Sequence, residues 1–255
     1  MNKIDTTLIA TRDEHKVRVL SLGAAPAHPL SRTMICALHE QIQLATEDSK
    51  INVIVLEGPG HIFCAGHDLK EIGRHRADSD LGRNYLQQLF TECSALMQDI
   101  TLSPKPTIAM VDGIATAGGL QLAAACDLIF ASTRATFCLP GVKNGGFCTT
   151  PAVAVSRNLS RKHMMELALS GDAFDVEWAL AAGLINRVFP SDQLTAATME
   201  FAQQIAGYHP TAIADGKRML HAQLEMPLDR AYAEATEVMI GHFMDPVRIA
   251  EEKNR

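Results

Sequence analysis

Two turns in this sequence have the composition of a site that stabilises negative charge. The first, residues 63–70, reads FCAGHDLK, and the second, residues 113–122, reads GIATAGGLQL. Each places glycine where the loop after an apolar run would enter a helix. Backbone N–H groups at a helix N-terminus have no partner within the helix, and the helix dipole adds positive potential there. Two such turns could therefore donate two hydrogen bonds to one developing oxyanion, although glycine also serves simply to pack a helix closely on a strand.

Other motifs that carry chemistry are absent. The sequence contains no GxxxxGK[ST], GxSxG or HExxH motif, and no GxGxxG between a predicted strand and helix. Its six cysteines are widely spread without a CxxC pair, which argues against a zinc site and against a disulfide framework. We therefore expect no metal, and we interpret the cysteines as buried, reduced thiols.

The charge and composition exclude several classes of protein. The 255 residues include 23 Lys plus Arg and 29 Asp plus Glu, a formal net charge of −6, and no long basic run. Nucleic-acid binding that is independent of sequence needs many phosphate contacts, so we expect no nucleic-acid partner. With 47% hydrophobic and 20% charged residues, the chain has the composition of a folded protein.

Hydropathy gives no sign of a membrane span or of a leader. The most apolar region, residues 107–130, is interrupted by Asp112, Gln121 and Asp127, so it lacks the roughly 18 uncharged apolar residues that a span requires. The first fourteen residues mix apolar and charged side chains, unlike a secretory or transit peptide. We therefore expect no membrane association and a cytoplasmic location.

The elements that position the two turns follow from the apolar pattern. Apolar runs at residues 17–22, 51–56, 107–111 and 127–131 predict strands, and the near-continuous run at 51–56 is typical of a strand buried on both faces. Apolar residues at 81, 85, 89, 93, 96 and 100 predict a helix over residues 81–100. After residue 151 the pattern is mainly helical, at 160–169, 175–182, 192–206, 211–224 and 228–243, with one strand at 185–189. This is an α/β protein in which strand, turn and helix units precede a helical C-terminal region.

Taken together, these features resemble the enoyl-CoA hydratase/isomerase (crotonase) family. The two turns lie about fifty residues apart, and the resemblance continues through ALAAGLINRV at 179–188 to the helix that contains Lys217. It implies the crotonase (ClpP/crotonase-like) α/β fold, a spiral of repeated ββα turns with a helical C-terminal region. Residues 1–190 would form the spiral core. Residues 191–255 would form the helical region that mediates trimers in the family, so we expect a homotrimer or a dimer of trimers (a hexamer).

The resemblance also implies a ligand and a site. In the family, two backbone N–H groups form an oxyanion hole for an acyl-CoA thioester, and their positions here are His67 and Gly118. Coenzyme A would arrive as part of the substrate, with no permanently bound cofactor, and the family's enzymes are typically lyases of fatty acid metabolism. The family binds CoA near the first turn, which points to Ala65 and Lys70. Because CoA is polyanionic, the net charge of −6 must conceal a local positive patch near Lys70.

The match fails at the positions that transfer protons. Hydratases of the family carry one glutamate three residues after the second oxyanion glycine and another after the proline of the next loop, but this sequence has Gln121 and Gly141 there. An amide does not titrate and glycine has no side chain. Each positioned acid or base is worth typically ~10² to 10⁴ in rate, so efficient hydration requires a substitute. The candidate substitutes are His67, Lys143, Asn144 and Cys148.

Three functions remain open at this point. The family default is an enoyl-CoA hydratase or isomerase that has an intact oxyanion hole and a displaced proton-transfer group. A second is different chemistry on the same fold, such as double-bond isomerisation, thioester hydrolysis or decarboxylation. A third is a non-catalytic acyl-CoA-binding protein. The loss of both glutamates favours the latter two over water addition, whereas the frequency of hydratases and isomerases in the family favours the first.

Overall fold

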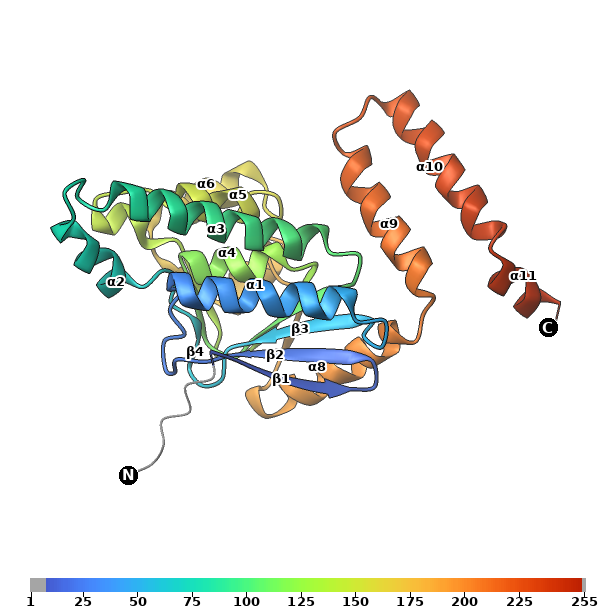
Figure 1. Cartoon of the computed structure of the whole chain (residues 1–255), viewed down its shortest axis with the longest axis horizontal. Coiled ribbons are helices and arrows are strands. Elements are labelled where there is room, and N and C mark those ends of the chain that lie inside the picture. The colour runs from blue at the N-terminus through green and yellow to red at the C-terminus, as the bar shows by residue number, and fades with distance from the viewer. Residues whose placement is uncertain (1–7, 254–255) are drawn as a thin grey trace.

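The structure, a computed structural model, describes residues 8–253 and contains two β-sheets (Figure 1). The first seven residues, on which the prediction of no leader partly rests, lie outside this range. A six-stranded sheet has the order β1-β2-β3-β5-β7-β10, and a four-stranded sheet has the order β4-β6-β8-β9. The larger sheet comprises Ile9–Glu14 (β1), Val17–Leu22 (β2), Val53–Glu57 (β3), Thr107–Val111 (β5), Leu128–Ser132 (β7) and Arg187–Phe189 (β10). The smaller comprises Ile62–Cys64 (β4), Ile114–Thr116 (β6), Thr136–Cys138 (β8) and Ala173–Phe174 (β9).

The chain forms a spiral of repeated ββα turns. In each of the pairs β3/β4, β5/β6 and β7/β8, the first strand joins the larger sheet and the second joins the smaller one. Successive strands of each sheet pair in parallel from β2 to β7 and from β4 to β8. The predicted crotonase-type α/β fold is therefore confirmed. Strand β1, antiparallel to β2, escaped the sequence pattern because only Ile9 of its six residues is buried.

Helices cover both faces of the larger sheet. In Figure 1, α1 and α3–α6 stack on one side and α8 lies on the other. The helices are Arg32–Glu47 (α1), Leu69–Arg74 (α2), Arg83–Leu102 (α3), Gly118–Ala125 (α4), Thr149–Val155 (α5), Arg161–Ser170 (α6), Val176–Ala181 (α7), Ser191–Ala206 (α8), Pro210–Gln223 (α9), Leu228–Phe243 (α10) and Pro246–Glu252 (α11), with 3₁₀ turns at His75–Ala77 and Pro140–Asn144. None of the helices within residues 8–253 has the length and apolar character needed to cross a bilayer.

The strands formed by the apolar runs lie between two buried apolar layers, one on each face of the larger sheet. In β2, Val17 and Val19 pack toward α8, whereas Leu20 and Leu22 pack toward the helices of the opposite face. The same alternation separates Val53 and Val55 from Ile54 and Leu56 in β3. Because both faces are covered, every position of such a strand favours an apolar residue.

Helix α3 begins later than the apolar stripe predicts. The prediction started it at Leu81, but Leu81 and Gly82 have φ of 56° and 82°, so the helix begins at Arg83. Leu81 is 67% exposed, whereas Tyr85, Leu89, Cys93, Leu96 and Ile100 of the predicted stripe are buried. The left-handed backbone before the helix turns the Leu81 side chain out of the stripe.

The C-terminal helices divide into one packed helix and a projecting arm. Helix α8 packs on the larger sheet through Leu194, Met199 and Ala202, while α9–α11 stand away from the body (Figure 1). Lys217 of α9 ties the arm to the body, because its Nζ donates to Asp127 Oδ2 at 2.5 Å and to the Lys105 carbonyl at 3.0 Å. The assembly role predicted for residues 191–255 remains a proposal, taken up below.

Candidate functional site

The two glycine-containing turns lie in direct contact. Strands β4 and β6 pair in parallel, so the turns that follow them leave the smaller sheet at the same edge. A Cβ placed at Gly66 would lie 2.9 Å from the Gly118 amide nitrogen and 3.1 Å from the Ala117 Cβ, and Gly66 has a φ of 84°. Only glycine suits both the backbone angle and this contact. The structure thus brings together the two turns that the sequence singled out.

The backbone N–H of His67 is left without a partner by the segment beside it. Leu30 bridges His67 in parallel: the Leu30 N–H donates to the Gly66 carbonyl at 2.8 Å, and the Asp68 N–H donates to the Leu30 carbonyl at 3.4 Å. These bonds use the residues that flank His67, so its own N–H points away from Leu30. Among residues 8–253 no acceptor is hydrogen-bonded to it.

The N–H of Gly118 has no acceptor within the described part of the chain for a different reason. Gly118 is the first residue of α4, and the first backbone bond of this helix runs from the Gln121 N–H to the Ala117 carbonyl at 3.1 Å. The N–H groups of the first helical residues therefore have no acceptor within the helix. No side chain caps this N-terminus.

An unusual backbone conformation at Ala117 orients the second turn. Its φ of 51° and ψ of −119° lie in a region that non-glycine residues rarely adopt, at a typical cost of roughly 1–3 kcal/mol. The Ala117 N–H donates to the Cys138 carbonyl of β8 at 2.9 Å, which holds the turn in place. Sequence reasoning missed this residue because alanine gives no signal of a positive φ.

The His67 side chain lies beside the same N-terminus. Its ring meets that of Phe90 edge-on, with centroids 5.2 Å apart, and its Cε1 lies 3.4 Å from the position of a Cβ at Gly118. Its Nε2 is buried without a hydrogen-bond partner in the described structure. Desolvation by burial lowers the pKa of His67 from 6.5 to about 4, so the imidazole is neutral at pH 7.

Gln121 adds a second unpartnered polar atom to this region. The residue is 5% exposed, and its Oε1 is buried with no partner among residues 8–253. It lies one helical turn after Gly118, and helical side chains lean toward the N-terminus of their helix. An unsatisfied buried polar atom costs about 1–3 kcal/mol, so two of them at one place call for an explanation.

The position of the second missing glutamate is closed. A Cβ at Gly141 would lie 2.6 Å from the Cys148 backbone nitrogen and 3.0 Å from the Cys148 Sγ. The loop therefore admits no side chain at position 141, and the Cys148 thiol lies against the space that one would use. Burial raises the pKa of the Cys148 thiol, which makes Cys148 a poor thiolate nucleophile.

The side chains of two other candidate substitutes, Lys143 and Asn144, make contacts at the surface of the protein. Lys143 pairs with Asp172 at 2.5 Å, and both side chains are more than half exposed. The side-chain amide of Asn144 donates to the Pro140 carbonyl at 3.4 Å within the same 3₁₀ turn. Neither contact involves the glycine turns.

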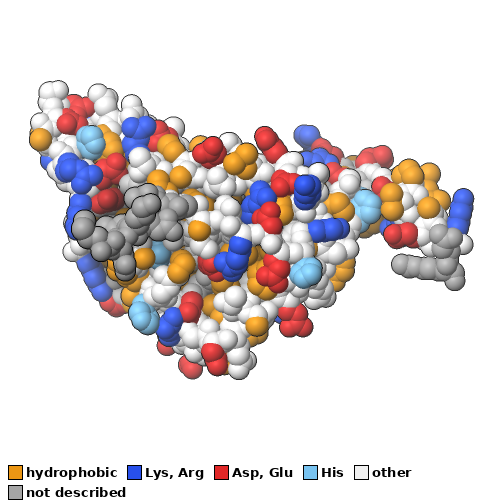
Figure 2. All heavy atoms as spheres, turned by 60° about the horizontal axis from the view of Figure 1, so that its bottom comes forward, with side chains coloured by type: hydrophobic (Ala, Val, Ile, Leu, Met, Phe, Trp, Pro, Cys, Tyr) orange, Lys and Arg blue, Asp and Glu red, His pale blue; other side chains and the backbone are white. Residues whose placement is uncertain are grey.

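The predicted CoA-binding residues lie at the first turn and on the helix after it. The Ala65 N–H donates to the Ala27 carbonyl at 2.9 Å, and the Asp68 side chain caps α2 by accepting from the Lys70 N–H at 2.9 Å. Lys70 is exposed, and neither it nor Arg74 has an ion-pair partner within residues 8–253. Figure 2 shows Lys and Arg side chains near the end of the molecule at which α2 projects.

The thiols differ in part from the prediction. All six cysteines are free, but only Cys64, Cys93 and Cys126 are buried. Cys36 is exposed, and Cys138 and Cys148 are half-buried. The expectation that all six are buried was therefore wrong, because spacing along the chain does not show which face of an element a thiol occupies.

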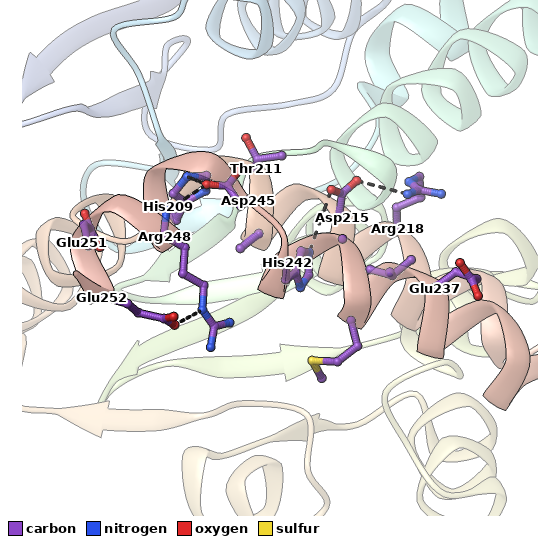
Figure 3. Close-up of a pocket in the computed structure, with 14 residues that line it drawn as sticks. His209, Thr211, Asp215, Arg218, Glu237, His242, Asp245, Arg248, Glu251 and Glu252 are labelled. Atoms are coloured by element: carbon purple, nitrogen blue, oxygen red, sulfur yellow. Dashed lines mark hydrogen bonds and ion pairs between the residues drawn. The ribbon is translucent and has the colours of Figure 1, made fainter.

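A separate cavity of about 740 Å³ lies within the C-terminal arm (Figure 3). Its walls come from α9–α11, where His209 faces Asp245 at 3.6 Å and Asp215 lies 3.1 Å from Arg218 and 3.9 Å from His242. No residue of the glycine turns lines it. Within residues 8–253 no group of three or more His, Cys, Asp or Glu side chains is arranged to hold a metal ion.

Sequence comparison links the chain to proteins with a stated location. It is 38% identical over 234 residues to enoyl-CoA hydratase domain-containing protein 3, mitochondrial, of Mus musculus. The aligned region covers 91% of this chain and 76% of the relative. Four further relatives with this name, all named as mitochondrial, match at 34–36% identity. These names contradict the predicted cytoplasmic location, which was inferred only from the absence of a leader-like composition.

Family and structure comparisons agree. The family model described as enoyl-CoA hydratase/isomerase matches residues 15–251. A crystal structure of an enoyl-CoA hydratase/isomerase family protein from Silicibacter pomeroyi is 54% identical with a TM-score of 0.89, covering 94% of this chain and 100% of that one. The structure of human enoyl-CoA hydratase domain-containing protein 3 is 32% identical with a TM-score of 0.90, covering 97% and 98%. The chain belongs to the enoyl-CoA hydratase/isomerase family.

Proposed function

We propose that this protein binds acyl-CoA thioesters and stabilises the thioester enolate with the backbone N–H groups of His67 and Gly118. The observation that carries the proposal is the pair of partnerless N–H groups at the contact of the two turns. Family membership supplies the substrate class. Each donor of such an oxyanion hole is typically worth roughly 2.7–4 kcal/mol of transition-state stabilisation.

The CoA portion would bind beside the first turn. Ala65 lies directly before Gly66, and Lys70 and Arg74 present charges without an ion-pair partner in the described chain. These cations suit the phosphates of CoA, and they supply local positive charge to a protein of net charge −6. Coenzyme A is thus part of the substrate, and the proposal requires no resident cofactor.

For the reaction, we favour proton removal at the α-carbon over water addition. A glutamate pair cannot act here, because position 121 is an amide and position 141 has no room for a side chain. Enolate formation needs the oxyanion hole and one proton acceptor. Hydration needs the oxyanion hole and two carboxylates, so it requires more proton-transfer groups. Thioester hydrolysis, decarboxylation and binding without turnover would use the same oxyanion hole. Activity measurements distinguish these three alternatives from enolate formation.

The first prediction concerns binding and polarisation of the thioester. A conjugated aromatic acyl-CoA is expected to bind more tightly than free CoA and to show a red-shifted absorbance, because its carbonyl oxygen accepts two hydrogen bonds. Calorimetry and absorbance spectroscopy measure the two effects. Lys70→Ala should weaken the binding of both ligands several-fold, whereas Lys50→Ala, in the loop between α1 and β3, should leave both unchanged.

Two results would contradict this function. Equal affinity for acyl-CoA and CoA, with no spectral shift, would contradict the assignment of an oxyanion hole to His67 and Gly118. Loss of trans-2-enoyl-CoA absorbance at rates typical of enzymes, on the order of 10 s⁻¹, would show that water addition proceeds without the glutamates.

We also propose that the C-terminal region, residues 191–255, assembles the protein into a trimer or a dimer of trimers. Support comes from the arm, on which large apolar side chains are at least half exposed: Leu220, Leu224, Leu228, Tyr232, Met239, Ile240, Phe243, Met244 and Val247. Contiguous apolar surface of this kind is typical of subunit interfaces.

Sedimentation provides the second prediction. The wild-type protein is expected to sediment as three or six copies, and the double variant Leu228→Asp/Tyr232→Asp as a monomer, because two charges would be desolvated at the interface. Leu102→Asp places a charge at an exposed apolar site at the end of α3 and should keep the assembly. A monomeric wild-type protein contradicts the proposal.

A further inference from the structure

We infer that the imidazole of His67 is the group that removes and returns the α-proton of the bound acyl thioester. The inference rests on the proposed function and assigns its missing proton-transfer residue to this chain. His67 would then serve twice, through its backbone N–H at the thioester oxygen and through its ring at the neighbouring carbon.

The first argument is the position of the ring. Its Cε1 lies 3.4 Å from the Cβ position of Gly118, so the imidazole flanks the residue whose N–H forms the second half of the oxyanion hole. Its Nε2 is buried and makes no hydrogen bond within residues 8–253, whereas Nδ1, which also makes none there, is not among the buried unpartnered atoms. The edge-on contact with Phe90 of α3 holds the ring in this orientation.

Gln121 provides an independent observation at the same place. Gln121 is more than nine-tenths buried, and its Oε1 has no partner in the described structure. The two unpartnered atoms thus belong to the turn after β4 and to the first turns of α4. Buried polar groups are rarely left unpaired, so both atoms are unusual features of this region.

Other titratable groups around the turns are already engaged. The Asp68 carboxylate accepts from the N–H groups of Lys70 and Glu71 at the start of α2, and Glu71 accepts from the Arg32 N–H at 3.2 Å. Lys143 is paired with Asp172. The Cys148 thiol stays protonated because burial raises its pKa. The His67 ring remains as a neutral base with a free nitrogen.

The chemical step balances without a further reactant. The lone pair of the unprotonated ring nitrogen takes the α-proton, and the C–H electrons form the C=C bond of the enolate. The carbonyl π electrons move to the thioester oxygen, which accepts hydrogen bonds from the N–H groups of His67 and Gly118. Return of a proton from the imidazolium to the α-carbon restores the thioester. In D₂O, the imidazolium exchanges with solvent and returns deuterium.

The experiment is α-proton exchange of butyryl-CoA in D₂O, followed by NMR, with the full-length protein. Butyryl-CoA has no double bond, so hydration cannot contribute. His67→Ala keeps the backbone N–H and is expected to lower the exchange rate by about 10²- to 10⁴-fold, while the red shift of the conjugated acyl-CoA is retained. Added imidazole should restore exchange in His67→Ala in proportion to its concentration. His61→Ala, an exposed histidine before β4, is the matched control and should exchange as the wild type does.

Rescue separates a chemical role from a structural one. His67→Gln fills the space of the ring with an amide that does not titrate, so exchange should be lost and imidazole should not restore it. Unchanged exchange in His67→Ala, or a loss that imidazole fails to rescue in a folded variant that retains the red shift, would overturn the inference. A wild-type protein that shows the red shift but no exchange overturns the inference alone, whereas a wild-type protein without the shift overturns the proposed function as well.

Discussion

Gly119→Ala is expected to lower the free energy of unfolding by on the order of 3 kcal/mol or more. A Cβ at this position would lie 2.0 Å from the Cys64 carbonyl oxygen and 2.6 Å from its carbonyl carbon. Both are backbone atoms of β4, so no side-chain rotation can relieve the clash. Overpacking of this kind typically costs about 1–3 kcal/mol where the surroundings can adjust, and more where they cannot.

Urea denaturation followed by circular dichroism measures this effect. Gly73→Ala in α2 is the matched control, because nothing lies within 4 Å of its Cβ position. That substitution should leave stability unchanged or raise it by up to about 1 kcal/mol through helix propensity. Equal stability of the two variants would show that α4 does not pack on β4 as closely as described.

Stability is also expected to fall as the pH is lowered from 7 to 4, in part because of His67. Its pKa is about 4 in the folded protein, below the 6.5 of an exposed histidine. Between these values the unfolded chain binds the proton and the folded protein does not, so protonation favours unfolding. The stabilisation is fully present above pH 6.5 and is lost as the pH falls toward 4, and one pKa unit is worth about 1.36 kcal/mol, so the contribution is roughly 3 kcal/mol.

His67→Gln isolates this contribution from that of the carboxylates. Several acidic groups with lowered pKa values, among them Asp13, Glu92 and Asp99, also lose stabilisation on acidification, in both proteins alike. The difference between the wild-type and variant free energies of unfolding should therefore narrow or reverse toward pH 4. Parallel curves across this range would show that the imidazole is neither buried nor neutral.

The two predictions concern one structural feature, the packing of the first turn on the start of α4. The close contacts at Gly66 and Gly119 exclude side chains, and this exclusion lets the first turn and β4 approach the start of α4. The same packing desolvates the His67 ring. A substitution that loosens the contact should therefore impair the proposed oxyanion hole and raise the pKa of the His67 imidazole together.

Much of the fold can be predicted from the pattern of apolar and polar residues in the sequence. Strands β2 and β5 and helix α10 were predicted with the bounds that the structure shows, and strands β3 and β7 and helix α8 to within two residues. The strands are buried on both faces and therefore show as apolar runs, and the helices are long enough to show an apolar period. The short strands β4, β6 and β9 have two or three residues each, too few for a period to be seen. Their place comes from pairing with strands distant in the sequence.

For the candidate site, the residue types were visible but their surroundings were not. The two turns, Gln121 and Gly141 could be named from motif and spacing. That Gly141 is closed by Cys148, that Ala117 adopts a positive φ and that the His67 nitrogen is buried without a partner depend on contacts between segments far apart in the chain. Local sequence encodes backbone propensity and apolar period, whereas solvent exclusion and steric closure arise when separate ββα turns stack. The protonation state of His67 therefore follows from packing, because its pKa falls only when neighbouring groups displace water from the ring.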